Sequence, residues 1–363
     1  MVATAQRFSE LHPGTEILWT RRPLQAFADT PLSRLAEEYD LLVIDHPFVG
    51  AAAASDFLLP LDEHVPSDFL SDQARHSVGG SHESYRYAGR QWALAIDAAA
   101  PISGRRPDSI ESPPPDWAGV LELARGGRVA VAALPVDCLM NFFMLCCTLG
   151  EEPCRSADRV VAVDAGADAL ELLRELLCAC PSECFVWNPI AVWEALASGG
   201  RLAYCPFAYG YSNYARRGYA AHALRFGGLP LLRGNRLRST LGGAGLAISR
   251  KCMERETALA YALYVAGAEC QAGLYGASGG QPAHRAAWLD PETNRISNNF
   301  FRDTLSTLDD AWVRPRYPGY IEFQTEAGEL VQEYLKSGGD ARQTLGGIEQ
   351  AYARSRSGIR GDE

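Results

Sequence analysis

The chain has 363 residues and a formal net charge of −10, from 34 Lys and Arg against 44 Asp and Glu, so nucleic acids and anionic membranes are poor partners for it. Apolar residues make up 47% and charged residues 21%, a balance that excludes general disorder. The length exceeds what one hydrophobic core usually supports and predicts two domains or lobes.

The N-terminal part is predicted to begin with a helix and a strand–helix–strand unit. Helical spacing over 2–11 places Phe8 and Leu11 on one apolar face, and His12-Pro13-Gly14 ends the helix. The unit that follows has a short strand at Glu16–Trp19, a helix at Pro31–Glu38 and an apolar run at Leu41–Asp45. That run is typical of a parallel strand buried on both faces, so a βαβ crossover is expected.

The middle of the chain alternates extended and helical patterns. A helix at Gly50–Phe57 precedes a polar, His-rich loop at about 64–84, and an extended segment over 91–102 is interpreted as a first crossing between lobes. The elements predicted next are a helix at Asp116–Arg125, a strand at Arg128–Ala132, and helices at Val136–Leu149, Ala165–Cys180 and Pro189–Ser198.

The C-terminal part returns to the first lobe and then completes the second. Strand Leu202–Pro206 and the aromatic loop Phe207–Tyr219 mark a second crossing, and Gly242–Ser249 is predicted to be a strand of the first lobe. Helices are expected at Asn298–Asp310, Ile321–Leu335 and Asp340–Ser355. The pattern predicts two α/β lobes, each discontinuous in sequence and joined by crossing strands.

The sequence as it stands predicts a cytoplasmic protein. The longest apolar run, Cys138–Leu149, is too short to cross a bilayer, so no direct membrane insertion is expected. Met1–Leu11 has no basic segment, apolar core or cleavage site of a secretory signal. The ten cysteines, several of them adjacent, are interpreted as reduced and buried.

Three blocks, at Tyr39–Leu61, Tyr87–Pro101 and Leu241–Trp288, resemble bacterial extracellular solute-binding protein family 1 in their order and spacing. These are the substrate-binding components of ABC transporters, and the resemblance extends from about Ala3 to about Leu335. It implies a two-lobed fold of the type II periplasmic-binding-protein kind. We place lobe one at 1–97 plus 242–290, lobe two at 98–207 plus 291–363, and a crossover or hinge region at 208–241.

The resemblance also exposes a departure at the start of the chain. Family members begin with a strand that lies between those corresponding to Glu16–Trp19 and Leu41–Asp45, and this first strand is missing here. An empty ladder position leaves backbone groups unpaired. We therefore hypothesise that the true start lies upstream, and the protein is then expected to be periplasmic or otherwise extracytoplasmic.

Two acidic positions follow predicted strands at the edge where α/β folds bind ligands. Asp45 and His46 follow the strand that ends at Ile44, and either they contact a ligand or Asp45 caps the next helix. Asp97 ends the segment Trp92–Ile96 and either faces the ligand, as the resemblance implies, or is a hinge residue held by backbone amides.

Aromatic and glycine-rich segments supply the other candidates. In the loop 206–219, Tyr209 and Tyr211 are the predicted ring contacts, the alternatives being a hinge that packs on itself or an anion site at Arg216 and Arg217. Gly243 lies in Gly242–Gly245, where the resemblance implies close backbone approach to the ligand and packing between lobes is the alternative. Gln281 follows a glycine turn and is placed near the cleft.

Neither a nucleophile nor a metal centre is expected. Gly276–Gly280 matches G-x-S-x-G, but a helix precedes Ser278 where the elbow needs a strand. The cysteines at 178, 180 and 184 lack a second ligand pair, and the histidines at 64, 76 and 82 are interpreted as a solvated loop. No cofactor is predicted.

The resemblance implies binding without chemistry. We expect a monomer that binds a small polar solute in the interlobe cleft by hinge closure, a sugar first and a small organic anion second, and that delivers it to ABC permease subunits if exported. The alternative is a cytosolic enzyme or ligand sensor on the same scaffold. An enzyme would need an assembled acid–base pair, for which Asp45, His46 and Asp97 are the candidates.

Overall fold

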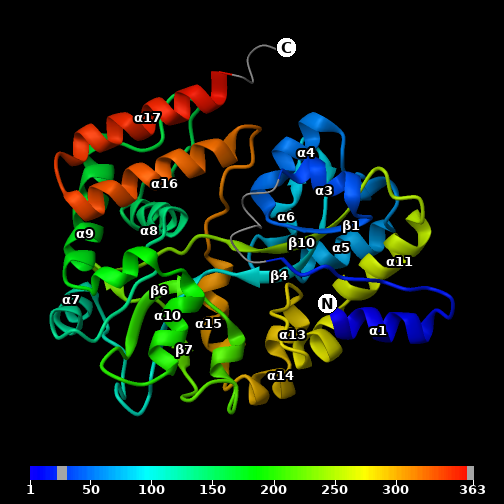
Figure 1. Cartoon of the computed structure of the whole chain (residues 1–363), viewed down its shortest axis with the longest axis horizontal. Coiled ribbons are helices and arrows are strands. Elements are labelled where there is room, and N and C mark those ends of the chain that lie inside the picture. The colour runs from blue at the N-terminus through cyan, green and yellow to red at the C-terminus, as the bar shows by residue number, and fades with distance from the viewer. Residues whose placement is uncertain (23–30, 358–363) are drawn as a thin grey trace. The chain divides into compact units, whose positions relative to one another are not determined.

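The computed structural model describes residues 1–22 and 31–357 (Figure 1). It divides the chain into two compact units, which are described separately below. Unit 1 comprises Met1–Ala98 and Gly242–Ile296, and unit 2 comprises Ala99–Leu241 and Ser297–Glu363. Both are therefore discontinuous in sequence, and residues 208–241 belong to unit 2. Residues 23–30 and 358–363, which the predicted lobes include, lie outside the described residues.

The sheet of unit 1 has the strand order β1-β10-β4, built from Leu41–Ile44, Gly242–Ile248 and Leu94–Ala99. β1 pairs with β10 in antiparallel register, Leu41 opposite Ile248 and Ile44 opposite Gly245. The expected βαβ crossover is therefore wrong. β1 buries Leu42 and Ile44 but leaves the alternate residues partly exposed, as in a half-buried strand. The predicted strand Glu16–Trp19 does not form, since this segment pairs with none of the described strands.

Tyr261 anchors the first residues of the chain to unit 1. It lies on α11 (Arg255–Ala266) and packs edge-on against Phe8 of α1 (Val2–Leu11), with ring centroids 5.2 Å apart. Its hydroxyl lies 2.9 Å from the Thr4 hydroxyl and accepts a hydrogen bond from the Trp19 indole nitrogen at 3.0 Å. The segment predicted as a strand is thus held by side-chain contacts rather than by a ladder.

The region predicted as a solvated His-rich loop is in fact folded. It contains α5 (Ser67–Arg75) and α6 (Ser81–Ser84), followed by the hairpin β2 (Arg86–Tyr87) and β3 (Arg90–Gln91). His82 is buried, so this part of the expectation is wrong. Pro66 precedes α5 and supplies the backbone turn at which the helix begins.

The other helical elements of unit 1 flank β1 or follow β10. They are α3 (Leu32–Glu38), η1 (His46–Phe48), α4 (Val49–Ser55), η2 (Leu61–Glu63), α12 (Ala268–Cys270), the π turn η5 (Gln271–Tyr275), α13 (Arg285–Leu289) and α14 (Pro291–Ile296). β10, α11 and α1 share one hydrophobic core, to which Phe8, Ile248 and Val265 contribute.

The sheet of unit 2 has the order β6-β5-β7, with β5 (Pro101–Arg105) antiparallel to both β6 (Tyr204–Tyr209) and β7 (Arg225–Gly227). The predicted strand Arg128–Ala132 is wrong, because only Val129 forms a bridge, to Tyr204. The short strands β8 (Leu231–Leu232) and β9 (Asn235–Arg236) form a separate hairpin.

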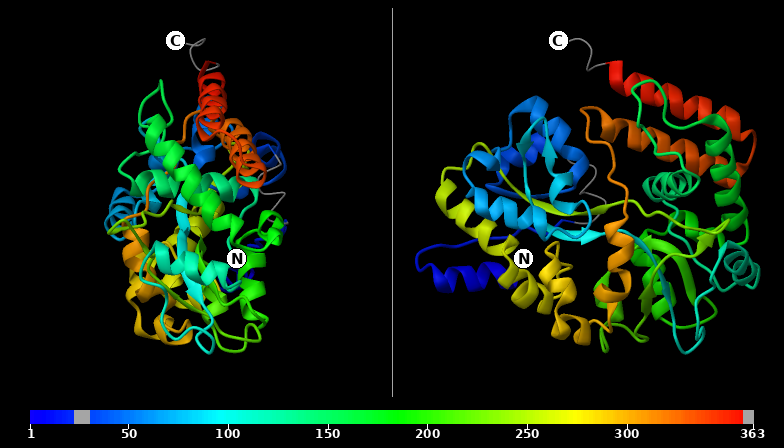
Figure 2. Two further views of the ribbon diagram at one scale, coloured as in Figure 1. Left: turned by 90° about the vertical axis from the view of Figure 1, so that its left-hand side faces the viewer. Right: turned by 180° about the vertical axis from the view of Figure 1, so that it is seen from behind.

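Helices make up about half of unit 2, and their positions agree closely with those predicted from the sequence. They are α7 (Trp117–Arg125), α8 (Pro135–Thr148), α9 (Val163–Cys178), η3 (Ser182–Val186), α10 (Pro189–Ala197), η4 (Ser212–Ala215), α15 (Phe300–Asp309), α16 (Tyr320–Ser337) and α17 (Ala341–Ser357). α16 packs against α8 and α17, and α16 and α17 run side by side (Figures 1 and 2). Gly328 permits this packing, because a Cβ there would lie 2.6 Å from the Pro135 carbonyl oxygen.

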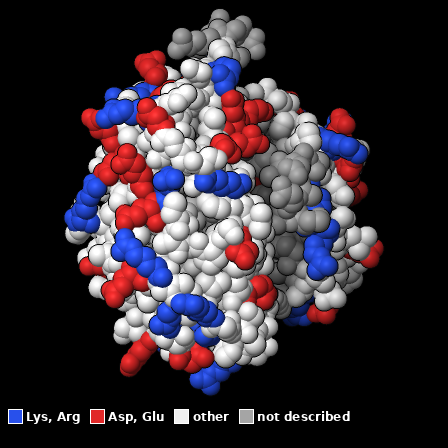
Figure 3. Space-filling view, turned by 60° about the vertical axis from the view of Figure 1, so that its left-hand side comes forward, with Lys and Arg blue, Asp and Glu red and all other residues white. Residues whose placement is uncertain are grey.

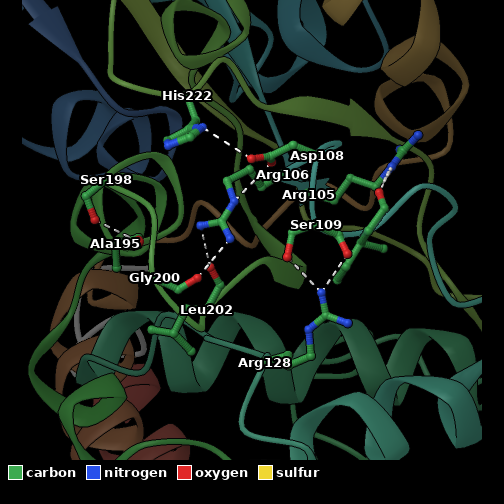
Figure 4. A network of polar contacts seen from close by, with 11 residues as sticks. Arg105, Arg106, Asp108, Ser109, Arg128, Ala195, Ser198, Gly200, Leu202 and His222 are labelled. Carbon is green, nitrogen blue, oxygen red and sulfur yellow. Dashed lines mark hydrogen bonds and ion pairs between the residues drawn. The ribbon is translucent and has the colours of Figure 1, made fainter.

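A polar network holds the end of β5 in unit 2 (Figure 4). The buried Arg106 guanidinium donates hydrogen bonds to the Gly200 carbonyl at 2.8 Å, the Leu202 carbonyl at 3.4 Å and the Asp108 carboxylate at 3.1 Å. Arg128 donates to the Ser109 carbonyl at 2.7 Å. These planar donors satisfy carbonyl groups that the strands leave unpaired.

The surface and the cysteines fit the composition. Basic and acidic side chains are interspersed on the face shown in Figure 3, with no basic patch there. All ten cysteines are free and seven are buried, although Cys178 is exposed, contrary to expectation. Among the described residues no helix combines the length and the apolar character needed to cross a membrane.

Candidate functional site

Three predicted site residues of unit 1 lie together where β4 ends and β10 begins. Asp97 is the fourth of the six residues of β4, Gly243 is the second residue of β10, and Gln281 lies in the segment before α13. An isolated bridge between Asp97 and Pro282 joins the turn to the strand. The sheet topology thus assembles residues that are more than 180 positions apart, as for Gln281 and Ala98.

Gly243 is needed for the close approach of two backbones. Its φ is +116°, and a Cβ there would lie 2.2 Å from the Asp97 carbonyl oxygen. An L-residue at this position would meet both backbone strain and steric overlap. The described contact is between strands within unit 1, which accounts for the glycine; its contact with a ligand remains a prediction.

Gln281 fixes the end of β4 through both its backbone and its side chain. Its side-chain amide donates to the Ala98 carbonyl at 2.9 Å, and its own carbonyl accepts from the Ala98 N–H at 3.1 Å. The side chain is largely buried. Gln281 therefore extends the β4 ladder across a turn, and its donor group is engaged in the described structure.

Asp97 carries an unusual carboxyl group. Burial raises its pKa to about 7, and a hydrogen bond with the backbone of Gln281 partly opposes that shift. Near neutral pH the group is thus divided between the protonated and the ionised form. It can donate a hydrogen bond to a polar ligand in one form and accept one in the other.

Asp45 and His46 take the local roles that the capping alternative predicts. The Asp45 carboxylate accepts from the His46 N–H at 2.8 Å at the start of η1 and lies 3.2 Å from His46 Nδ1. The His46 side chain is fully buried and meets the Tyr85 ring edge-on, with centroids 6.2 Å apart. The β1–β10 register, continued by one residue, places Asp45 beside Ala244 and so next to Gly243.

Tyr209 and Tyr211 lie in unit 2, at the end of β6 and just after it. The Tyr209 hydroxyl is 3.2 Å from the Thr240 hydroxyl, and its carbonyl accepts from the buried Trp193 indole at 2.8 Å. Tyr211 precedes η4. Both side chains are partly exposed, whereas the neighbouring Tyr204, Phe207 and Tyr214 are buried.

The self-packing alternative holds for another pair in the same loop. Tyr214 and Tyr219 pack edge-on with centroids 5.2 Å apart, and the Tyr214 hydroxyl donates to Glu194 at 2.7 Å. Exposure therefore leaves Tyr209, Tyr211 and Tyr219 as accessible rings. Tyr209 is tied at two points to buried neighbours, Thr240 and Trp193.

Sequence reasoning missed Thr240 and Ser239. Thr240 is fully buried beneath the Tyr209 hydroxyl, and the Ser239 hydroxyl donates to the Pro101 carbonyl at 2.7 Å. The signal available in the sequence was a pair of hydroxyl residues immediately before the glycine-rich segment. Both hydroxyl groups contact residues distant in the sequence, so they position the chain through hydrogen bonds rather than through side-chain charge.

The described arrangement offers hydrogen-bonding groups and ring faces rather than an activated nucleophile. Ser278 follows the π turn, its N–H bonded to the Leu274 carbonyl at 3.0 Å, so the strand–turn–helix context of a nucleophile elbow is absent around it. His46 is fully buried beside Asp45 and is not presented as a general base in the described structure.

Comparison with known proteins identifies the fold. No family model and no curated protein matches the chain. Maltose-bound MalE3 of T. maritima is 18% identical over 96% of this chain and 94% of that protein, with a TM-score of 0.83. An ABC transporter solute-binding protein of Agrobacterium radiobacter K84 in complex with ribitol is 16% identical over 97% and 94%, with a TM-score of 0.82.

A maltose/maltodextrin-binding domain, MalE of Bdellovibrio bacteriovorus bound to maltotriose, gives the same result, with 14% identity over 99% of this chain and 95% of that one and a TM-score of 0.79. The likeness extends over both units in all three cases. The chain therefore has the α/β fold of the two-lobed, type II periplasmic binding proteins.

Proposed function

We propose that the chain binds a small polar solute, with a sugar as the first class and a small organic anion as the second, and hands it to an ABC permease. The observation that carries the proposal is the likeness to proteins solved with maltose, ribitol and maltotriose over at least 96% of this chain. These ligands share many hydroxyl groups on a compact carbon skeleton.

The side chains proposed for binding match that chemistry. A sugar has apolar ring faces and a polar rim, and it needs flat aromatic faces together with hydrogen-bonding groups. Tyr209 and Tyr211 supply the rings, and Asp97 supplies a carboxyl that can donate or accept near neutral pH. Asp45 at the end of β1 is a further acceptor for a hydroxyl group.

The other three predicted residues would act through position. Gly243 and Gln281 define the backbone around Asp97, and His46 orders the turn that presents Asp45. The proposed mechanism is closure of the two units around the solute, the motion by which periplasmic binding proteins trap ligands. Release then requires a permease, so the proposal places the working protein outside the cytosol, as a monomer with no covalent step.

A binding experiment tests the proposal. The purified chain is screened by thermal shift against sugars, polyols and small organic acids, and hits are measured by isothermal titration calorimetry. A ligand at 100 times its Kd is expected to stabilise the folded state by about 2.7 kcal/mol. The ligand should be recovered unchanged by NMR, since conversion would favour the enzyme alternative.

Two variants of the same loop sharpen the test. Tyr209→Ala removes the proposed ring contact and should weaken binding of the hit by about tenfold or more. Tyr219→Ala is the matched control, because Tyr219 is 54% exposed and packs only on Tyr214 among the described ring contacts. Equal affinities for the two variants would contradict the role of Tyr209, and no ligand from any class would contradict the proposed function.

A further inference from the structure

We infer that unit 1 contains a site for a divalent transition metal ion, Zn²⁺ in the first place, formed by Asp72, His76 and His284. One ligand atom from each residue lies within 4.8 Å of the other two. Asp72 and His76 are four positions apart, at the end of α5 and just after it, and His284 immediately precedes α13. The site belongs to unit 1 alone, so it is independent of the proposed solute binding.

The three side chains already converge on one another. Asp72 Oδ1 lies 2.8 Å from His76 Nδ1, and Asp72 Oδ2 lies 3.2 Å from His284 Nε2. The two imidazole rings are 5.3 Å apart at their centroids, with an interplanar angle of 32°. A tetrahedral Zn²⁺ ion needs N and O ligands about 2.0–2.2 Å from the metal, which small side-chain movements of these three groups provide.

The backbone beneath the site is fixed from both sides. Ser77 and His284 form an isolated antiparallel bridge, and the Arg285 N–H donates to the His76 carbonyl at 2.7 Å. The Arg285 guanidinium donates to the Ser77 carbonyl at 3.1 Å. The ends of the two segments that carry the ligands are therefore tied together before any ion binds, which lowers the entropic cost of assembling the site.

The ligand set selects the kind of ion. Mg²⁺ and Ca²⁺ prefer oxygen ligands, whereas two imidazoles and one carboxylate favour Zn²⁺, Cu²⁺ or Ni²⁺. His284 is nearly buried, but the side chains of His76 and Asp72 are 48% and 38% exposed. An ion can therefore enter from solvent and keep water as a fourth ligand.

Metal binding has a defined cost at His284. Its Nδ1 accepts a hydrogen bond from the Ala286 N–H at 3.2 Å, which places the ring proton on Nε2, toward Asp72. When Nε2 binds an ion, the ring proton moves to Nδ1 and the bond from Ala286 is lost. We therefore expect micromolar rather than nanomolar affinity.

Calorimetry with ZnCl₂ on the metal-stripped full chain, without an affinity tag, tests the site. All proteins carry Cys178→Ser, because Cys178 is the exposed cysteine and would compete for the ion. One Zn²⁺ per chain is expected, and Co²⁺ should give the absorption of a tetrahedral site. His76→Gln alters a half-exposed ligand and should weaken Zn²⁺ binding by at least about tenfold.

His64→Gln is the matched control, because His64 is an exposed histidine twelve positions away with no described ligand neighbours. It should leave Zn²⁺ affinity unchanged. Circular dichroism and melting temperatures without metal verify that both variants fold. No Zn²⁺ binding by the parent protein, or equal affinities for His76→Gln and His64→Gln, would overturn the inference.

Discussion

Asp97→Asn tests whether the carboxyl at the end of β4 is buried as the structure indicates. The pKa of this group is raised from 3.8 to about 7 by burial. A folded state with the higher pKa binds a proton more tightly than the unfolded state does. The contribution of the Asp97 carboxyl to the free energy of unfolding is therefore fully present below about pH 4 and is lost as the pH rises through about 7.

The magnitude follows from the shift. A difference of about three pKa units corresponds to about 4 kcal/mol between low pH and pH 8 at full effect. Asp97 is not fully enclosed, so water screens part of this cost and we expect a change of about 2 kcal/mol. Asn has the same shape without a titratable proton, so the variant should lose this part of the pH dependence and gain relative stability at pH 8.

The assay is urea unfolding of the wild type and of Asp97→Asn at pH 4.5 and at pH 8. The difference between their free energies of unfolding is then compared between the two pH values. Asp137, whose pKa burial also raises to about 7, is present in both proteins and cancels in that difference. Asp158→Asn, on an exposed loop, is the control. If the stability difference between wild type and Asp97→Asn is the same at both pH values, the reasoning about burial of Asp97 is refuted.

Three further predictions concern the backbone and buried polar contacts. Gly243→Ala should lower the free energy of unfolding, measured in urea titrations, by about 3 kcal/mol. Gly234 also has a positive φ, but no atom lies within 4 Å of an added Cβ, so Gly234→Ala should lower that free energy by only about 1 kcal/mol. Tyr261→Phe removes the hydroxyl that accepts from the Trp19 indole and that lies 2.9 Å from the Thr4 hydroxyl, so it should lower the melting temperature, at a cost of about 2 kcal/mol. Arg106→Lys cannot span three acceptors and should cost a similar amount, again about 2 kcal/mol, with unchanged stability a contradiction in either case.

The sequence predicted the helices well because their signals are local. Asp116 caps α7 through a bond to the Gly119 N–H, as its type and position indicate, and the long apolar run at 138–149 is a buried helix, α8. The strands fared less well, because a ladder depends on a partner distant in sequence. Val129 has the pattern of a strand residue, yet it forms a single bridge to Tyr204.

The candidate site likewise combines features that local sequence signals predict with contacts between distant residues that they do not. Position after a strand indicated Asp45 and Asp97, and composition indicated the tyrosines. Neither signal could show that the Gln281 amide is engaged by Ala98, because that contact joins residues 183 positions apart. The glycines were similarly ambiguous, since the space that Gly243 leaves is filled by the Asp97 backbone.

The close approach of Gly243 to Asp97 links the fold of unit 1 to its proposed function. Gly243 lies against the backbone carbonyl of Asp97, the residue whose side-chain carboxyl has a pKa raised by burial. A larger residue at 243 would push the strands apart, admit water to Asp97 and lower that pKa toward its ordinary value. In the proposed binding role of Asp97, Gly243 would influence the hydrogen bond to a solute without touching the solute, because it determines how well the Asp97 carboxyl is shielded and hence whether that carboxyl donates or accepts near neutral pH.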